Sequence, residues 1–230
     1  MIRYLIFILI FVASCGSPVR REYIQAKRLA NDIKSGPVEW TAAIGKFENI
    51  VKMKVNARLQ QAQLYSRLGD HFFAREMWKD ALENYKLASE IRPSSASLWY
   101  KQGLCLSQLF RYSVNAEEKK YLLSQACDAY EKSLIAEPFY VPALYALGIL
   151  EFEFNSNQER GIELMNLILK KEPHNISALF ALGRFYYMTG EYEKSLECYK
   201  KLESVNLNKD QKEQVRININ TVKSKIYEGG

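Results

Sequence analysis

The sequence predicts an all-α protein: a superhelix of four to five stacked helical hairpins, closed by a C-terminal capping helix. Glycine and proline are sparse, at 11 and 6 of 230 residues, which favours helices over folds rich in tight turns. A pattern of large, small and aromatic residues returns about every 34 residues, and a proline stands near the end of most copies, at Pro93, Pro138 and Pro173. Hairpins repeated in this way bury their apolar faces by stacking on their neighbours.

Residues 1–14 have the pattern of an export signal. Arg3 precedes an apolar run from Tyr4 to Val12, which is about half as long as a membrane-spanning helix. The run ends in Val12-Ala13-Ser14-Cys15, which resembles the lipobox of bacterial lipoproteins. This resemblance implies that Cys15 receives a diacylglyceryl group on its sulfur, becomes the first mature residue and is acylated with a chain such as palmitate. An ordinary cleaved signal and an uncleaved anchor are the alternatives.

Residues 15–19 are expected to form a lipid-tethered linker, and residues 20–61 a degenerate hairpin. The segment YIQAKRLANDIK predicts a first helix that ends at Ser35-Gly36, and Pro37 begins a second helix with WTAAIGKFENIV. The segment VRREYIQAKR holds a local excess of basic residues. Contact with lipid headgroups and ordinary surface charge are the two interpretations of this excess.

Residues 62–95 and 176–209 are the clearest copies of the repeat. Each has a large residue, a Leu-Gly pair, an aromatic residue, a second aromatic residue, a small residue and a third aromatic residue. These positions are Tyr65, Leu68-Gly69, Phe72, Trp78, Ala81 and Tyr85 in the first, and Leu179, Leu182-Gly183, Tyr186, Tyr192, Ser195 and Tyr199 in the second. The pattern resembles the tetratricopeptide repeat, a helix–turn–helix unit, and implies a right-handed superhelix.

Residues 96–140 and 141–175 are two further copies of different length. The first is longer by 11 residues, and the excess lies between Leu106 and Ala126. Asn115 and Glu118 have the spacing of a capping box, which predicts that a lengthened second helix begins there. The second of these copies is one residue longer than the clearest copies and has an atypical turn, NSNQ.

Small residues mark where the two helices of each hairpin approach most closely. They are Gly69, Gly103, Gly148 and Gly183 on the first helices, and Ala81, Ala126, Gly161 and Ser195 on the second helices. After the last copy, residues 210–228 predict an amphipathic capping helix. Its apolar stripe, Val215, Ile219, Val222 and Ile226, is expected to cover the last repeat, with pairing to a second copy as the alternative.

The sequence indicates no catalytic chemistry, so no enzyme, cofactor or metal site is expected. His71 and His174 have no nucleophile or metal partner at a meaningful spacing, and no phosphate-binding glycine loop is present. Cys105, Cys127 and Cys198 lack metal-site spacing and are expected to be buried thiols, with a Cys105–Cys127 bridge as the alternative. Interleaved charges of both signs argue against a nucleic-acid partner.

The family resemblance places certain residues of each first helix on the concave face of the superhelix. These groove residues are Phe73, Tyr100, Leu104, Tyr145, Ile149, Phe152, Phe180, Arg184 and Tyr187. An aromatic residue recurs at one groove position, as Tyr100, Tyr145 and Phe180, which suits an extended peptide or an apolar ligand. The alternative is that the groove is filled by the chain's own terminal segments or long side chains.

One class of tetratricopeptide protein does not match this groove. Binders of chaperone tails hold a terminal carboxylate with Lys and Asn at the groove positions. Here the corresponding positions carry Ser66 and Asp70, then Tyr100 and Leu104. A single nearby cation, Lys101, does not make such a clamp.

The resemblances together imply a function in protein interaction at the bacterial cell envelope. The chain is expected to be a membrane-anchored scaffold or adaptor that binds a protein or peptide partner through an aromatic-lined groove. Its membrane contact is the lipid on Cys15. The alternative is a lipoprotein that binds a small hydrophobic ligand or peptide and accompanies a transporter. The sequence leaves the partner, the membrane leaflet and the oligomeric state open.

Overall fold

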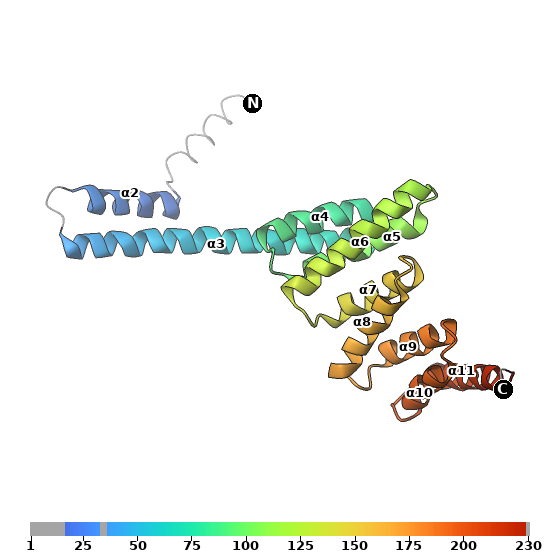
Figure 1. Cartoon of the computed structure of the whole chain (residues 1–230). Coiled ribbons are helices and arrows are strands. Elements are labelled where there is room, and N and C mark those ends of the chain that lie inside the picture. Colours follow the sequence, from blue (N-terminus) through green and yellow to red (C-terminus); the bar gives the residue numbers. More distant parts are fainter. Residues whose placement is uncertain (1–16, 33–35, 229–230) are drawn as a thin grey trace. The chain divides into compact units, whose positions relative to one another are not determined.

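The computed structural model describes residues 17–32 and 36–228, so the predicted signal and Cys15 lie outside the described residues. The described residues form ten helices and no strand (Figure 1). They are α2 (Pro18–Asn31), α3 (Pro37–Phe73), α4 (Trp78–Ile91), α5 (Ala96–Tyr112), α6 (Ala116–Ala136), α7 (Val141–Glu153), α8 (Gln158–Lys171), α9 (Ile176–Met188), α10 (Tyr192–Glu203) and α11 (Lys209–Glu228). Within these ranges no helix has the length and apolar character needed to cross a bilayer.

The chain divides into two compact units, residues 1–61 and 62–230. In the first unit, α2 packs antiparallel on the N-terminal part of α3 (Figure 1). The Tyr23 and Phe47 rings meet edge to face with centroids 6.0 Å apart, and Lys46 Nζ donates to Gln25 Oε1 at 3.0 Å. Ala26 is fully buried at this contact. The predicted degenerate hairpin therefore exists as a helix pair, although α2 ends at Asn31, earlier than the expected Ser35-Gly36.

The helix α3 crosses a predicted boundary. The sequence predicted that the degenerate hairpin ends at residue 61 and that the next repeat begins with a separate helix at residue 62. Instead, α3 runs without a turn from Pro37 to Phe73. The sequence between Gly45 and Gly69 has no glycine or proline and is rich in Lys, Arg, Gln, Leu and Ala, which are strong helix formers. Nothing in that segment can end a helix, so the second helix of the degenerate hairpin continues into the first helix of the next repeat.

The second unit is a row of helical hairpins. The C-terminal end of α3 pairs with α4, and the pairs α5–α6, α7–α8 and α9–α10 follow in order, each packed on the next (Figure 1). The lengthened copy has longer helices, 17 residues in α5 and 21 in α6, against 13 and 12 in α9 and α10. Asn115 caps α6 by accepting the Glu118 N–H at 2.9 Å, which confirms the predicted helix start.

Most of the hairpins are held by a ring of the second helix that fills the gap left by a glycine of the first. A Cβ at Gly69 would lie 2.5 Å from the Tyr85 ring, and a Cβ at Gly183 would lie 2.8 Å from the Tyr199 ring. Gly103 meets the Tyr130 ring in the same way. These distances are too short for any side chain, so the glycines are required by packing and not by backbone conformation.

The hairpin α7–α8 uses a different contact. Its first-helix glycine, Gly148, faces the end of the Met165 side chain and the backbone of Gly161. A Cβ at Gly161 would in turn lie 2.8 Å from the Gly148 carbonyl oxygen and 2.6 Å from Phe152 Cβ. Glycine on both helices lets the two backbones approach directly, where the other hairpins insert a tyrosine.

The apolar stripe of α11 is buried inside the chain. Val215, Ile219 and Val222 form one core cluster with Tyr199 and Leu202 of α10. The expected capping role of this helix is therefore confirmed, because its apolar face covers the last hairpin and is not left for a second copy.

A Gly103→Ala substitution tests the packing role of these glycines. The added methyl group overpacks against Tyr130, so the free energy of unfolding should fall by about 1–3 kcal/mol. Gly45→Ala is the matched control, because Gly45 is also helical but its Cβ would meet nothing within 4 Å. The control should stabilise the helix by up to about 1 kcal/mol. Urea unfolding followed by circular dichroism measures both, and equal stabilisation by the two variants would contradict the packing argument.

Candidate functional site

Two pockets lie along the face formed by α5, α7 and α9 in the second unit. The first, here called the α5–α7 pocket, has a volume of about 440 Å³. Its lining consists of Tyr100, Leu104, Ser107, Tyr130, Val141, Pro142, Tyr145, Ala146, Ile149, Leu150, Asn175 and Ser177. The second, the α9–α11 pocket, has a volume of about 380 Å³. Its lining consists of Tyr145, Phe180, Ala181, Arg184, Tyr187, Tyr199, Gln214, Asn218, Thr221 and Val222. Tyr145 lines both pockets, so they adjoin at this residue, and the two pockets together are here called the aromatic groove.

The α5–α7 pocket is lined by uncharged residues and is rich in tyrosine. Tyr130, buried against Gly103, shares a hydrogen bond of 3.0 Å with the Ser107 hydroxyl, and both residues line the pocket. The Tyr100 ring lies between Tyr130 and Tyr140, with centroid distances of 5.9 and 5.6 Å. Burial raises the pKa of Tyr100 and of Tyr130 above the usual phenol value. Both phenols therefore stay neutral at physiological pH, and the pocket offers apolar surface with a few hydroxyl groups.

The α9–α11 pocket combines rings with one ion pair. Arg184 forms a salt bridge with Glu153, so its charge is already paired within the chain. Burial raises the pKa of the Tyr199 hydroxyl to about 12, so this phenol is neutral as well. The opposite wall comes from α11, where Gln214 Nε2 donates to Asn218 Oδ1 at 2.8 Å. The terminal helix thus lines one end of the groove without filling it.

Seven of the nine predicted groove residues line these pockets. Tyr100, Leu104, Tyr145 and Ile149 line the α5–α7 pocket, and Tyr145, Phe180, Arg184 and Tyr187 line the α9–α11 pocket. That these residues bind a partner or ligand stays a prediction. Residues of the second helices, Tyr130 and Tyr199, also line the groove, although the predicted groove drew only on the first helices.

Phe152 and Phe73 are corrections to the predicted groove. Phe152 is only 3% exposed, and its ring stacks on Phe185 with centroids 3.8 Å apart. Phe73 packs against Trp78 at a centroid distance of 4.8 Å, beside the core cluster under α4 and α5. Phe152 is covered by α9 and belongs to the core, whereas Phe73 is half-buried against the start of α4.

Lys101 is neutralised by an ion pair that the sequence did not reveal. Its Nζ lies 2.6 Å from Asp70 Oδ1 and 3.5 Å from Ser66 Oγ, and the Tyr85 hydroxyl donates to the same Asp70 oxygen at 2.7 Å. These partners bind Lys101 from within the chain. The geometry agrees with the rejection of a carboxylate clamp, since the cation such a clamp needs is already occupied.

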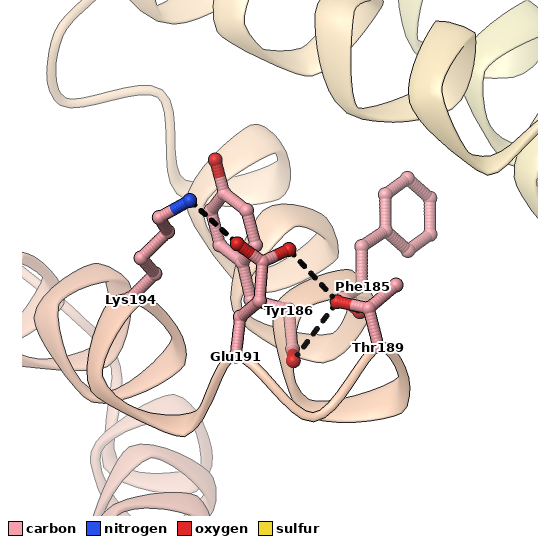
Figure 2. A network of polar contacts seen from close by, with 5 residues as sticks. All are labelled: Phe185, Tyr186, Thr189, Glu191 and Lys194. Atoms are coloured by element: carbon pink, nitrogen blue, oxygen red, sulfur yellow. Dashed lines mark hydrogen bonds and ion pairs between the residues drawn. The ribbon is translucent and has the colours of Figure 1, made fainter.

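A dense network of polar contacts at the α9–α10 turn is structural. Figure 2 shows Thr189 donating to the carbonyl oxygens of Phe185 and Tyr186, while Lys194 Nζ lies 2.5 Å from Glu191 Oε2. The Lys194 hydrogen bond lowers the pKa of Glu191, with a further contribution from Thr189. Gly190, with φ of 81°, supplies the left-handed conformation between the helices. All these interactions close a turn, and the residues that make them line neither pocket.

The three described cysteines are free thiols of low reactivity. Burial raises the pKa of Cys105 and of Cys127 to about 12, and that of Cys198 to about 11. The alternative of a Cys105–Cys127 bridge is not adopted. Among the described residues no group of three or more His, Cys, Asp or Glu side chains is placed to hold a metal ion.

No family model matches this chain. Among curated proteins, it is 33% identical to the "Peroxisomal targeting signal receptor" of Candida albicans over 137 residues, which cover 60% of this chain and 21% of that protein. It is 28% identical to "Protein CTR9 homolog" of Arabidopsis thaliana over 123 residues, covering 52% and 10%. The chain thus spans a quarter or less of the length of the curated relatives it matches.

Solved structures show the fold. A thermophilic tetratricopeptide protein of Thermus thermophilus, TTC0263, matches with a TM-score of 0.60 and 18% identity, covering 87% of this chain and 98% of that one. MamA matches with a TM-score of 0.53 and 20% identity, covering 79% and 98%. This chain therefore has the tetratricopeptide-repeat fold.

Alkylation kinetics test the raised pKa values of the thiols. In a Cys15→Ser variant at pH 8, the folded protein should react with iodoacetamide at least about 100-fold more slowly than the urea-unfolded protein, because only the thiolate reacts. The rate in the folded protein should keep rising about tenfold per pH unit above pH 9, whereas an ordinary thiol levels off near its pKa of about 8.5. A rate that levels off near pH 8.5 in the folded protein would contradict the assigned pKa values.

Proposed function

We propose that this protein is a non-enzymatic scaffold or adaptor of the bacterial cell envelope, tethered to a membrane by a lipid on Cys15. It binds a segment of a partner protein in the aromatic groove. The observation that carries the proposal is the α5–α7 pocket, whose lining is uncharged and includes Tyr100, Tyr130 and Tyr145. Aromatic side chains that line one pocket are typical of protein-binding surfaces.

The groove chemistry favours an extended segment with apolar side chains. The α5–α7 pocket has room for one or two large side chains and offers hydroxyl groups, such as that of Ser177, to a peptide backbone. Arg184 is the one charged residue among the described residues that line the two pockets, and it already forms a salt bridge with Glu153. A partner recognised by its charge is therefore disfavoured. The tetratricopeptide fold, and a relative named as a receptor for a targeting signal, support peptide recognition.

A small hydrophobic ligand is the second candidate, in a lipoprotein that accompanies a transporter. The volume of about 440 Å³ lies in the range of small-molecule pockets, and the uncharged residues of its lining favour an apolar ligand.

The membrane tether is supported by the sequence Val12-Ala13-Ser14-Cys15 and by the position of Cys15, two residues before Ser17. Ser17 caps α2 by accepting the Arg20 N–H. A diacylglyceryl group with a further acyl chain would provide two or more lipid chains, which is enough for stable anchoring.

Alanine at Tyr100 and Tyr145 tests the groove. The double variant should bind a defined partner at least about tenfold more weakly, because buried aromatic contacts dominate interface energies. The measurement is in-cell cross-linking of the membrane fraction followed by mass spectrometry. Tyr112→Ala with Tyr121→Ala is the matched control, since both tyrosines are exposed and lie outside the two pockets. If the partner is retained but native mass spectrometry shows loss of a bound small molecule, the second candidate is correct. No change in either experiment rejects the groove.

Cys15→Ser tests the tether. The variant should lose metabolic labelling by palmitate and leave the membrane fraction, while its circular dichroism and unfolding midpoint stay those of the parent. Cys127→Ser is the control, because this half-buried thiol lies in α6 and should leave labelling unchanged. Labelling that persists without Cys15 would show that the lipid is attached elsewhere.

A further inference from the structure

The net charge of this chain is concentrated in the first unit. Residues 1–61 hold 10 of the 32 basic residues and 4 of the 26 acidic residues, which gives +6. Residues 62–230 hold the remaining 22 basic and 22 acidic residues and are therefore neutral. A charge distribution this uneven gives the first unit its own long-range attraction to anionic surfaces.

The first unit also exposes an apolar stripe along α3. The stripe consists of Trp40, Ile44, Phe47, Val51 and Val55, and four of these side chains are 50–58% exposed. Their spacing of three and four residues confines them to an arc of about 80° on one side of the helix. Large apolar residues grouped in this way on a helix indicate a binding surface, whereas scattered ones need no explanation.

The stripe stays open because α2 packs beside it. The buried residues of α3 in this unit are Ala43 and Ile50, which lie on an adjacent side of the helix. At the edge of the stripe, Phe47 meets α2 through Tyr23. Further along α3, in the second unit, the same side of the helix carries Ala62 and Gly69, and there Tyr85 of α4 covers it. The side of α3 that α4 covers in the second unit is therefore exposed in the first unit, where it carries the stripe.

Basic side chains border the stripe on both helices. On α3, Arg58 continues it beyond Val55, and Lys52 and Lys54 lie beside its two edges. On α2, Arg20 and Lys27 lie three residues before and four residues after Tyr23, so they share the side that meets Phe47. An apolar stripe with Trp and Phe, bordered by Lys and Arg, is the pattern of a helix that lies in a membrane interface.

We propose that the α2–α3 hairpin of the first unit docks on an anionic lipid bilayer. The stripe faces the acyl-chain boundary, and Arg20, Lys27, Lys52, Lys54 and Arg58 contact lipid phosphates. The proposal extends the proposed function, because a lipid on Cys15 would hold the same hairpin at the same surface. A bilayer is favoured over a second copy of this chain, since pairing two hairpins would bring like charges together, whereas anionic lipid neutralises them.

Tryptophan fluorescence of the full chain in vesicles tests the docking. With phosphatidylglycerol present, Trp40 should be quenched by lipids brominated in their acyl chains. In vesicles of phosphatidylcholine alone the quenching should be weak. Trp40→Phe should abolish the quenched component, because Trp78 and Trp99 lie in the second unit. Raising the ionic strength from about 0.1 M to about 1 M should also weaken quenching, since the Debye length falls from about 10 to about 3 Å.

Charge reversal separates electrostatics from general affinity for lipid. Lys52→Glu with Lys54→Glu and Arg58→Glu should reduce docking on the order of 100-fold, at about fivefold for each cation near the surface. The matched control changes three exposed lysines of the second unit, Lys120, Lys200 and Lys212, to Glu and should leave Trp40 quenching unchanged. Equal loss in both variants would show a general effect of net charge and overturn the assignment to the hairpin.

The remaining outcomes distinguish this proposal from the tether. Quenching of Trp40 that persists in Cys15→Ser supports docking by the hairpin, whether or not the lipid is attached to Cys15. A protein that floats with vesicles while Trp40 is not quenched is tethered without docking, and the proposal fails. A dimeric mass with a blue-shifted Trp40 emission in the absence of vesicles would show that a second copy covers the stripe, which also overturns it.

Discussion

The contact between a first-helix glycine and a second-helix tyrosine organises the second unit. Because Gly103 leaves room for Tyr130, the ring is buried between α5 and α6, and its hydroxyl reaches Ser107 on the groove side. Tyr130, which fills the space between the two helices of the hairpin, is therefore also part of the pocket lining. Tyr199 repeats this arrangement against Gly183 in the α9–α11 pocket. Packing and the groove surface cannot vary independently at these positions, since one side chain serves both.

The hairpin α7–α8 has no tyrosine at this contact, and its share of the groove differs accordingly. Met165 takes the place of the ring, and the glycine pair Gly148 and Gly161 brings the two backbones together. A thioether brings no hydroxyl to the groove, and no residue of α8 lines either pocket, whereas the first helix of this hairpin, α7, lines both. That first helix supplies Tyr145, which lines both pockets. The two pockets of the groove therefore adjoin at a single first-helix side chain.

The sequence predicted the hairpins well because their signals are local. The Leu-Gly pairs and the small second-helix residues act within a single hairpin, and the Asn115 cap acts on the first turn of its own helix. It failed where a neighbouring helix decides the outcome. A groove position gives the direction of a Cβ but not the residues that cover it, so Phe152, which stacks on Phe185, could not be told from Tyr145. The ion pair between Asp70 and Lys101 joins residues 31 positions apart and has no signature in either segment.

The separation of charge between the units bears on how binding and docking can coexist. The groove lies in a unit with no net charge, and the charged residue among its described lining, Arg184, is paired with Glu153. An anionic bilayer therefore exerts little long-range attraction on that unit. The first unit, with the excess of basic residues and the open stripe, is the one such a surface attracts. If the hairpin docks as proposed, electrostatics alone select which unit lies on lipid, and the aromatic groove is not drawn to the headgroups that would compete with its partner.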